Sequence, residues 1–191
     1  MAQVTNLYAS TPVGLRSKYA RPIAAFTRPA DTTAYAQNDV VSDSSATAKC
    51  LIFLDAGGQG VVQNATVAFH DGQNVDLELF LFQSEPTNFV DNALCNLATG
   101  DLRHCIGSFV FNYLNRRPAT ATGTINVYRS DLGATVAGSG LQTVDQGLPF
   151  NSVSGALFGL LVTRTGFTPV ASTRFDLSLG IQTSLSASVQ S

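Results

Sequence analysis

The feature that most constrains the fold is a series of short apolar runs with a two-residue period, separated by clusters of glycine, aspartate and asparagine. Residues 46–83 show it best, because three such runs are separated there by DAGGQG (55–60) and HDGQN (70–74). These residue types accept a positive φ or bond their own backbone, and so form turns between strands. We therefore predict three consecutive strands, arranged as a β-meander.

The last of these runs, VDLELFLFQ (75–83), has two distinct faces. Successive side chains of a strand point to opposite sides of the sheet. One face is therefore apolar and the other changes from charged to aromatic: Val75, Leu77, Leu79 and Leu81 on the first, and Asp76, Glu78, Phe80 and Phe82 on the second. We predict a strand that begins at the wet edge of a sheet and then runs beneath a loop or a partner.

Beyond residue 83 the strand pattern is interrupted once and then resumes. Residues 84–105 form a predicted excursion with one short helix, with Thr99 as its N-cap and Asp101 in its first turn. Further strands are predicted within 106–114, 123–131, 141–150, 155–164 and 172–183, the last two joined by a connection of hairpin length. Alternation assigns to the core Phe109, Phe111, Leu157, Leu160 and Phe175.

Many short strands, almost no helical periodicity and no alternation of strands with helices predict an all-β protein. The 191 residues suit one domain, in a size range that buries roughly 70% of the unfolded surface. We predict a single β-sandwich or jelly-roll-like domain over residues 22–183. An extended N-terminal arm (1–21) precedes it and a polar C-terminal tail (184–191) follows it.

The chain carries few charges. Charged residues make up 13% of it, against about 25% in a typical soluble domain. Such a surface repels its own copies weakly, which suits a protein packed against neighbours; the alternative is a lightly charged monomer. The net charge of -2 gives no general affinity for polyanions, so nucleic acid is not an expected partner.

Positive charge is concentrated at the start of the sequence and in one later loop. Four cations precede the first acidic residue, Asp31, so the leading segment either meets an acidic partner surface or is a solvated tail. Two adjacent arginines stand before Pro118 in a predicted exposed loop. The candidate contact residues of this kind are Arg16, Lys18, Arg21, Arg28, Arg116 and Arg117.

Four aromatic residues have two interpretations. They either cover a sheet face within the chain or form a contact between subunits. Membership of the chain's own core is the favoured alternative. These residues are Phe80, Phe82, Phe89 and Phe150.

The three cysteines, Cys50, Cys95 and Cys105, are an odd number without the spacing of a disulfide framework. The first residues show no basic segment followed by an apolar one, so no signal peptide is predicted, and no apolar run approaches the ~20 residues that span a bilayer. We expect synthesis in a reducing cytoplasm, buried free thiols and no membrane partner.

Asp76 and Glu78 are the best candidates for a catalytic pair. Residues two apart on a strand are separated by about 6.6–6.8 Å, which lies in the range of carboxyl separations in glycosidases. A general acid, however, needs a dry, apolar pocket, and this pair follows the turn-forming DGQN. We predict that both carboxylates are solvated strand charges that discourage edge aggregation.

No other catalytic, cofactor or metal site is predicted. Cys50, Cys95, His104 and Cys105 lack the spacing that concentrates zinc ligands. His70, at the junction of a strand and a turn, is expected to bond a turn carbonyl. The sequence has no GxSxG elbow, and DAGGQG lacks the residues that complete a phosphate loop. We predict that the chain is not an enzyme and needs no cofactor.

Four stretches resemble, in the same order, a family of small virion proteins of tailed bacteriophages: FTRPADTTAYAQNDVV (26–41), DLELFLFQSEPTNFVDNA (76–93), IGSFVF (106–111) and LFGLLVTRTGFTPVASTRFDLSLGI (157–181). Some proteins of this kind are similar to the decoration or cement proteins that coat icosahedral heads. The resemblance implies a β-sandwich-like subunit, trimers at capsid symmetry axes and no catalytic residues.

The leading hypothesis is a decoration protein on the capsid exterior, with the major capsid protein and other copies of itself as partners. Its N-terminal arm would order on the shell or on an adjacent subunit. The alternative is a tail, neck or host-surface module that binds glycan or receptor, although the absence of tryptophan speaks against it. A third hypothesis is a glycan hydrolase that uses Asp76 and Glu78.

Overall fold

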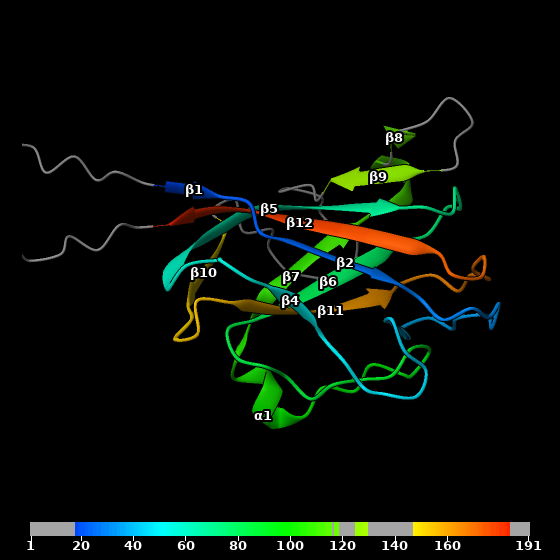
Figure 1. Cartoon of the computed structure of the whole chain (residues 1–191), viewed down its shortest axis with the longest axis horizontal. Coiled ribbons are helices and arrows are strands. Elements are labelled where there is room, and N and C mark those ends of the chain that lie inside the picture. Colours follow the sequence, from blue (N-terminus) through cyan, green and yellow to red (C-terminus); the bar gives the residue numbers. More distant parts are fainter. Residues whose placement is uncertain (1–17, 116, 119–124, 130–146, 184–191) are drawn as a thin grey trace, which may run out of the picture.

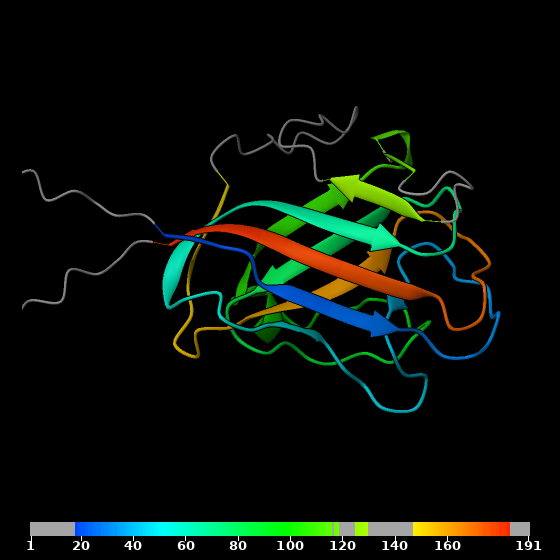
Figure 2. The same cartoon turned by 45° about the horizontal axis from the view of Figure 1, so that its top comes forward.

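The computed structural model describes residues 18–115, 117–118, 125–129 and 147–183. They form two antiparallel sheets packed face to face (Figures 1 and 2). The predicted all-β fold, a β-sandwich with one short helix, is therefore confirmed.

The larger sheet is built around β12 (Arg174–Thr183) and β5 (Gln59–Phe69), which pair with each other. On the side away from β5, β12 pairs with β1 (Lys18–Ala20) and β2 (Ile23–Thr27). On the side away from β12, β5 pairs with β9 (Asn126–Arg129) and β10 (Leu148–Asn151). β8 (Arg117–Pro118) then pairs with β9.

The smaller sheet is built around β11 (Leu157–Thr163) and β6 (Leu77–Phe82). The far edge of β11 pairs with two short strands, β3 (Val40–Val41) and β4 (Leu51–Phe53). The far edge of β6 pairs with β7 (Cys105–Phe111).

The antiparallel pairs are nested in the sequence. β2 pairs with β12, β3 and β4 pair with β11, β5 pairs with β9 and β10, and β6 pairs with β7 at the centre. Such nesting is what a long hairpin gives when it is rolled up, with successive pairs falling in alternate sheets. This strand order is that of a jelly roll.

The core lies between the two sheets and is filled by the side chains that alternation predicts. Val75, Leu77, Leu79 and Leu81 are all fully buried. Four of the five residues assigned to the core from other runs belong to this core and are at most 5% exposed: Phe109, Phe111, Leu157 and Phe175. Leu160 is also buried, but it lies opposite Phe80 on the outer face of the smaller sheet, so its predicted place between the sheets is wrong. The prediction of an inward apolar face is therefore confirmed.

Two predicted connections are wrong. The strands in residues 46–83 are not a meander, because β4 and β6 belong to the smaller sheet and β5 to the larger. In the same way, β11 and β12 are not a hairpin but lie in opposite sheets. Their connections are long enough to cross the ~10 Å between packed sheets, and burial of both sheet faces favours the crossing.

The excursion between β6 and β7 covers the outer face of the smaller sheet. Backbone hydrogen bonds hold it to β3 and to the turn before β3: Val40 N–H donates to Ala93 C=O at 2.8 Å, and Cys95 N–H to Asn38 C=O at 2.9 Å. Figure 1 shows the segment and its helix α1 beneath this sheet. The loop predicted to lie over the second face of β6 is therefore this excursion.

Helix α1 (Thr99–Leu102) begins one residue before the predicted position. Its N-cap is Ala98, whose N–H donates to the Asp101 carboxylate at 3.2 Å, so a first-turn side chain replaces a capping one. A 3₁₀ turn, η1 (Tyr113–Asn115), follows β7. Among the described residues, no helix is long and apolar enough to cross a membrane.

The final residues of the predicted N-terminal arm belong to the sheet. β1 pairs with the last residues of β12, Lys18 facing Thr183. Pro22, which cannot donate a backbone hydrogen bond, separates β1 from β2 on the same edge. Residues 1–17 of the predicted arm and the predicted tail, 184–191, lie outside the described residues.

We expect Leu79→Ala to lower the free energy of unfolding by about 2–5 kcal/mol, because it leaves a cavity between the sheets. Leu79 is 0% exposed. The matched control is Leu114→Ala, at a side chain that is 73% exposed, where the change should stay within about 0.5 kcal/mol. Urea unfolding measures both, and equal losses would contradict the assignment of the core.

Candidate functional site

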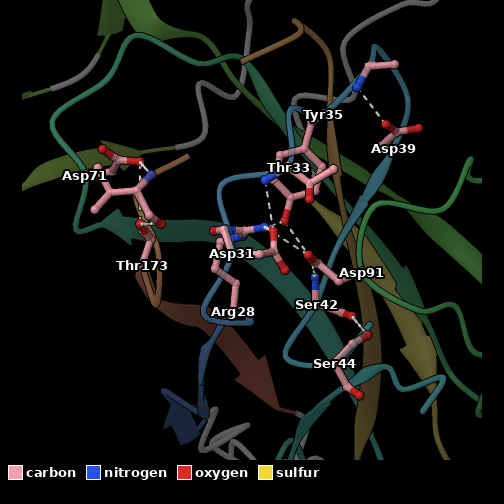
Figure 3. A network of polar contacts seen from close by, with 12 residues as sticks. Arg28, Asp31, Thr33, Tyr35, Asp39, Ser42, Ser44, Asp71, Asp91 and Thr173 are labelled. Atoms are coloured by element: carbon pink, nitrogen blue, oxygen red, sulfur yellow. Dashed lines mark hydrogen bonds and ion pairs between the residues drawn. The ribbon is translucent and has the colours of Figure 1, made fainter. Parts of the chain in front are cut away.

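The most deeply buried ion pair in the described part of the chain joins Arg28 to Asp91, and it lies at the centre of Figure 3. Arg28 directly follows β2, whereas Asp91 lies in the excursion. Arg28 Nη2 donates to Asp91 Oδ2 at 3.1 Å, and the two side chains are 0% and 2% exposed. The ion pair therefore ties the edge of the larger sheet to the cover of the smaller sheet.

Tyr35 completes this cluster, which we call the buried network. Its hydroxyl accepts a hydrogen bond from Arg28 Nε at 2.8 Å and donates one to Asp91 Oδ1 at 2.6 Å. Its ring stacks on Phe167, with 4.9 Å between the ring centroids. Burial, and then the hydrogen bond to Asp91, raise the pKa of Tyr35 far above its usual value. The hydroxyl therefore stays protonated and donates permanently.

Further contacts satisfy the charged groups of the buried network. Ser42 N–H donates to Asp91 Oδ1 at 2.8 Å. Arg28 Nη1 donates to the Asp31 carbonyl at 2.7 Å, and Nη2 to the Asp31 carboxylate at 3.1 Å. Both Asp91 oxygens and all three guanidinium nitrogens thus have partners. This arrangement holds three loop segments in place, and its polar atoms are occupied by one another.

The predicted pair Asp76 and Glu78 is divided between two structural roles. Asp76 Oδ1 accepts a hydrogen bond from Tyr113 N–H at 2.8 Å, and the Asp76 N–H donates to Thr165 Oγ1 at 3.0 Å. Asp76 therefore orders the turns that follow β7 and β11.

Glu78 is not the solvated strand charge that the sequence predicts. It is 9% exposed, and Arg164 Nε donates to its Oε2 at 2.5 Å. Arg164 also donates to the Asn38 side chain, and its guanidinium lies 5.5 Å from the centroid of the Phe80 ring. The outer face of β6 is thus closed by an arginine that lies 86 residues away in sequence.

His70 contacts a carboxylate instead of the predicted turn carbonyl. Its Nε2 lies 2.8 Å from Asp176 Oδ2, across the paired strands β5 and β12. Arg174 holds the same carboxylate, with 2.6 Å between Nη2 and Oδ1. The hydrogen bond from Arg174, followed by that from His70, lowers the pKa of Asp176.

The three cysteines are free and half-buried, whereas the sequence predicted buried thiols. Burial raises the pKa of all three, that of Cys50 to about 11, so the thiols are protonated near neutral pH. Among the described residues, no three His, Cys, Asp or Glu side chains form a group that could hold a metal ion.

Three residues named as candidate contacts lie inside the domain. Arg28 is 2% exposed, Phe82 0% and Phe150 6%. Arg28 belongs to the buried network, and burial supports the core alternative for the two phenylalanines. Arg28 is therefore a structural residue and not the surface contact that the sequence suggested.

The other candidate contacts are placed in different parts of the molecule. Arg21 lies on the exposed edge of the larger sheet, where its guanidinium donates to Ser178 Oγ at 3.3 Å. Phe80 and Phe89 are half-buried on the covered side of the smaller sheet. The side chains of Arg16, Lys18, Arg116 and Arg117 lie outside the described part of the chain.

The outer face of the larger sheet carries few charged residues on its central strands, β5, β12 and β2. Its outward strand positions carry mostly small side chains. Arg174 and Asp176 are paired with each other on this face, and Arg21 donates to Ser178 there. Figure 2 shows this sheet toward the viewer. The outward residues include Ile23, Ala25, Thr27, Asn64, Thr66, Ala68, Arg174, Asp176, Ser178, Gly180 and Gln182.

Gly180 keeps this face flat. A Cβ at this position would collide with the Tyr19 hydroxyl and the Asn64 side-chain amide. Both of these groups therefore lie low across the strands. Tyr19 remains 61% exposed there, so its ring is available to a partner.

A groove of about 270 Å³ opens at one edge of the sandwich, between β2 and the short strands β3 and β4. Its lining includes the apolar side chains of Phe26, Val41, Leu51 and Leu161, but polar atoms make up the larger part of the lining surface. The remaining lining residues include two exposed isoleucines, Ile23 (66%) and Ile52 (47%), and the paired Asp43 and Lys49.

The chain matches no family model and no curated protein.

We expect Asp91→Ala to lower the free energy of unfolding by about 3–5 kcal/mol, because it leaves the Arg28 guanidinium buried without its counter-charge. The control is Asp43→Ala, which removes the exposed pair with Lys49 and should cost at most about 1 kcal/mol. Chemical unfolding measures both changes. Equal effects would show that the buried network does not hold the loops.

We expect acid to weaken the fold partly through Asp176. A carboxyl whose pKa is lowered on folding stabilises the protein above its unfolded pKa, and this contribution is lost as the pH falls through the folded pKa. The loss should therefore occur below the usual value of 3.8. Arg174→Gln removes the largest cause of the shift and should flatten the decline in stability between about pH 5 and pH 2.

The matched control for this pH dependence is Arg103→Gln, at an exposed arginine beside α1. Thermal unfolding across this pH range should give the same slope for the control as for the unchanged protein. A slope that Arg174→Gln leaves intact would contradict the assigned role of the Arg174–Asp176 pair.

Proposed function

We propose that the chain is a structural protein of a bacteriophage virion, a head decoration or cement protein that binds the outer capsid surface as a trimer and stabilises the shell. The observation that carries the proposal is the asymmetry of the sandwich. The chain's own loops cover the smaller sheet, whereas the larger sheet presents a flat face of small, mostly uncharged side chains.

Such a face suits adhesion to a lattice. Small side chains lose little conformational entropy when a partner covers them, and uncharged ones carry a smaller desolvation cost than isolated ions. Tyr19 and Ile23 lie at the β1–β2 edge of this sheet and are 61% and 66% exposed. They supply the apolar anchors on which interface energy concentrates.

The proposed trimer multiplies a modest interface. A standard interface covers about 800 Å² of each partner, and three linked copies engage the shell together. Once one copy is bound, the others bind at a high effective concentration, so weak contacts add up to firm attachment. Rigidity of the subunit matters here, and the buried network fixes the loops on the opposite side.

The test is co-sedimentation of the purified protein with mature heads from which it has been removed. We expect saturable binding, with occupancy set by the symmetry of the shell. Thr66→Glu places a charge in the middle of the flat face and should weaken binding at least tenfold, because a charge would have to be desolvated there. Circular dichroism verifies that this variant is folded.

The control is Leu102→Glu in α1, at a side chain that is 56% exposed on the covered side. It should bind heads as the unchanged protein does. Absence of binding to heads would overturn the proposal, and binding to host cell surfaces instead would favour the tail or receptor-binding alternative. Equal binding by the two variants would move the contact away from the larger sheet.

A further inference from the structure

We propose that two copies of the chain associate edge to edge: β2 of one copy pairs antiparallel with β2 of the other about a two-fold axis at Ala25, so that the two larger sheets become one. This inference goes beyond the proposed function, because it adds a second contact between copies to the trimer proposed there. The open edge of β2, the groove beside it and the side chains along the strand carry it.

The outer edge of β2 has unpaired backbone groups. Figure 2 shows β2 (blue) as the outermost strand beside β12. In an antiparallel pair, alternate residues bond the neighbouring strand. Arg28 N–H donates to Thr173 C=O at 3.0 Å, so the even-numbered residues face β12. The N–H and C=O groups of Ile23, Ala25 and Thr27 therefore point away from it, and within the described part of the chain they bond no other strand.

This edge lacks the features that keep exposed strand edges from pairing. Lysine, proline or a covering loop usually protects such an edge. β2 reads IAAFT, without a charge or a proline, and the groove of about 270 Å³ opens beside it. Residues 23–26 line this groove and bring no polar side chain to it, so β2 offers a partner its backbone groups. A strand added at this edge would satisfy them.

The side chains of β2 are complementary to a second copy of the same strand. A two-fold axis at Ala25 places Ile23 opposite Thr27 of the other copy, and Phe26 opposite Ala24, each pair occurring twice. On the inward face a large ring thus lies across from a small side chain, and Phe26 is half-buried before a partner covers it. On the outward face no like charges meet. Cross-strand pairs of this kind stabilise a sheet.

Charge favours the antiparallel orientation. Arg21 lies directly before β2 and is exposed, and the segment after β2 carries Asp31, whose side chain is 39% exposed. The two-fold axis brings the start of each strand beside the end of the other, so Arg21 of each copy lies towards the segment that carries Asp31 of the other. A parallel pair would instead place the two copies of Arg21 side by side, which is unfavourable.

The geometry of the pair also extends the flat face of the larger sheet. An antiparallel pair of this kind has its two-fold axis perpendicular to the sheet, so both outer faces lie on the same side. Beneath them the smaller sheets approach each other through β4, where Ile52 and the following Leu54 are 47% and 64% exposed. A two-fold contact is closed, so pairing stops at two copies and covers the edge of β2 in both.

The first test is cross-linking through an introduced cysteine. Facing Cα atoms of a hydrogen-bonded antiparallel pair are about 5.5 Å apart, a distance that a disulfide spans. Ala25→Cys should therefore form a covalent dimer under mild oxidation, as measured by non-reducing electrophoresis. The control is Ile23→Cys on the same face of the same strand. Its two copies would lie four residues apart along the paired strands, about 13 Å, and should stay unlinked, as should the unchanged protein.

The second test exchanges charges at the axis, where residue 25 faces itself. Ala25→Lys and Ala25→Glu each place two like charges opposite one another, so each should weaken association about threefold or more. An equal mixture of the two variants should restore association, since lysine then faces glutamate. Sedimentation equilibrium measures the two variants and their mixture.

The third test removes the central hydrogen bonds. Ala25→Pro loses an N–H that faces away from β12, so the fold should survive, as checked by thermal unfolding. The midpoint of association should move to at least tenfold higher protein concentration, because both bonds of the central pair are lost. The control Ala25→Ser keeps the N–H and should associate as the unchanged protein does. Loss of this contact halves the mass, whether the free chain is otherwise a monomer or a trimer.

Equal cross-linking at the two cysteine positions, a mixture without recovery, or a mass that Ala25→Pro leaves unchanged would overturn the inference. So would a monomer whose Ala25 amide hydrogen is protected from exchange, because another part of the chain would then cover the edge. These measurements contain no capsid, so their result is separate from head binding. Edge-paired copies that ignore heads would refute the proposed function alone, and a chain that binds heads but fails these tests would refute the edge pairing alone.

Discussion

The pairing of β12 with β5 is the contact on which the rest of the fold depends. It runs from Phe175 opposite Phe69 to Thr183 opposite Gly60, with one irregularity after Gly180. Both strands turn apolar side chains inward, and every other strand of the larger sheet except β8 pairs with one of them. Because the two strands lie far apart in the sequence, this pairing also imposes the nested order of all the others.

The alternation of apolar side chains was sufficient to predict the strands, the buried face of β6 and the class of fold. It could not assign strands to sheets, since a turn of a given length can either reverse a strand within a sheet or carry it across the core. The meander and the final hairpin failed for this reason. Only the packing of both faces decides between the two paths.

The polar contacts were beyond sequence reasoning for a different cause. Arg28 and Asp91 are 63 residues apart, and Glu78 and Arg164 are 86 apart. A single sequence contains no signal that joins such partners. The turn before β6 suggested that Glu78 is exposed to water, but in the structure the side chain of Arg164 covers Glu78 and donates to it. His70 likewise faces Asp176 because the register of β5 and β12 brings them together.

The position of β12 has a mechanical consequence. A force applied to Thr183 along the strand would load the hydrogen bonds to its neighbours in shear, so that many would have to break at once instead of opening one after another. The adjacent start of β1 at Lys18 shares that load from the same end of the sandwich. The sandwich therefore resists a pull along β12, whereas a force that separated Lys18 from Thr183 would open the β1–β12 pairs one after another.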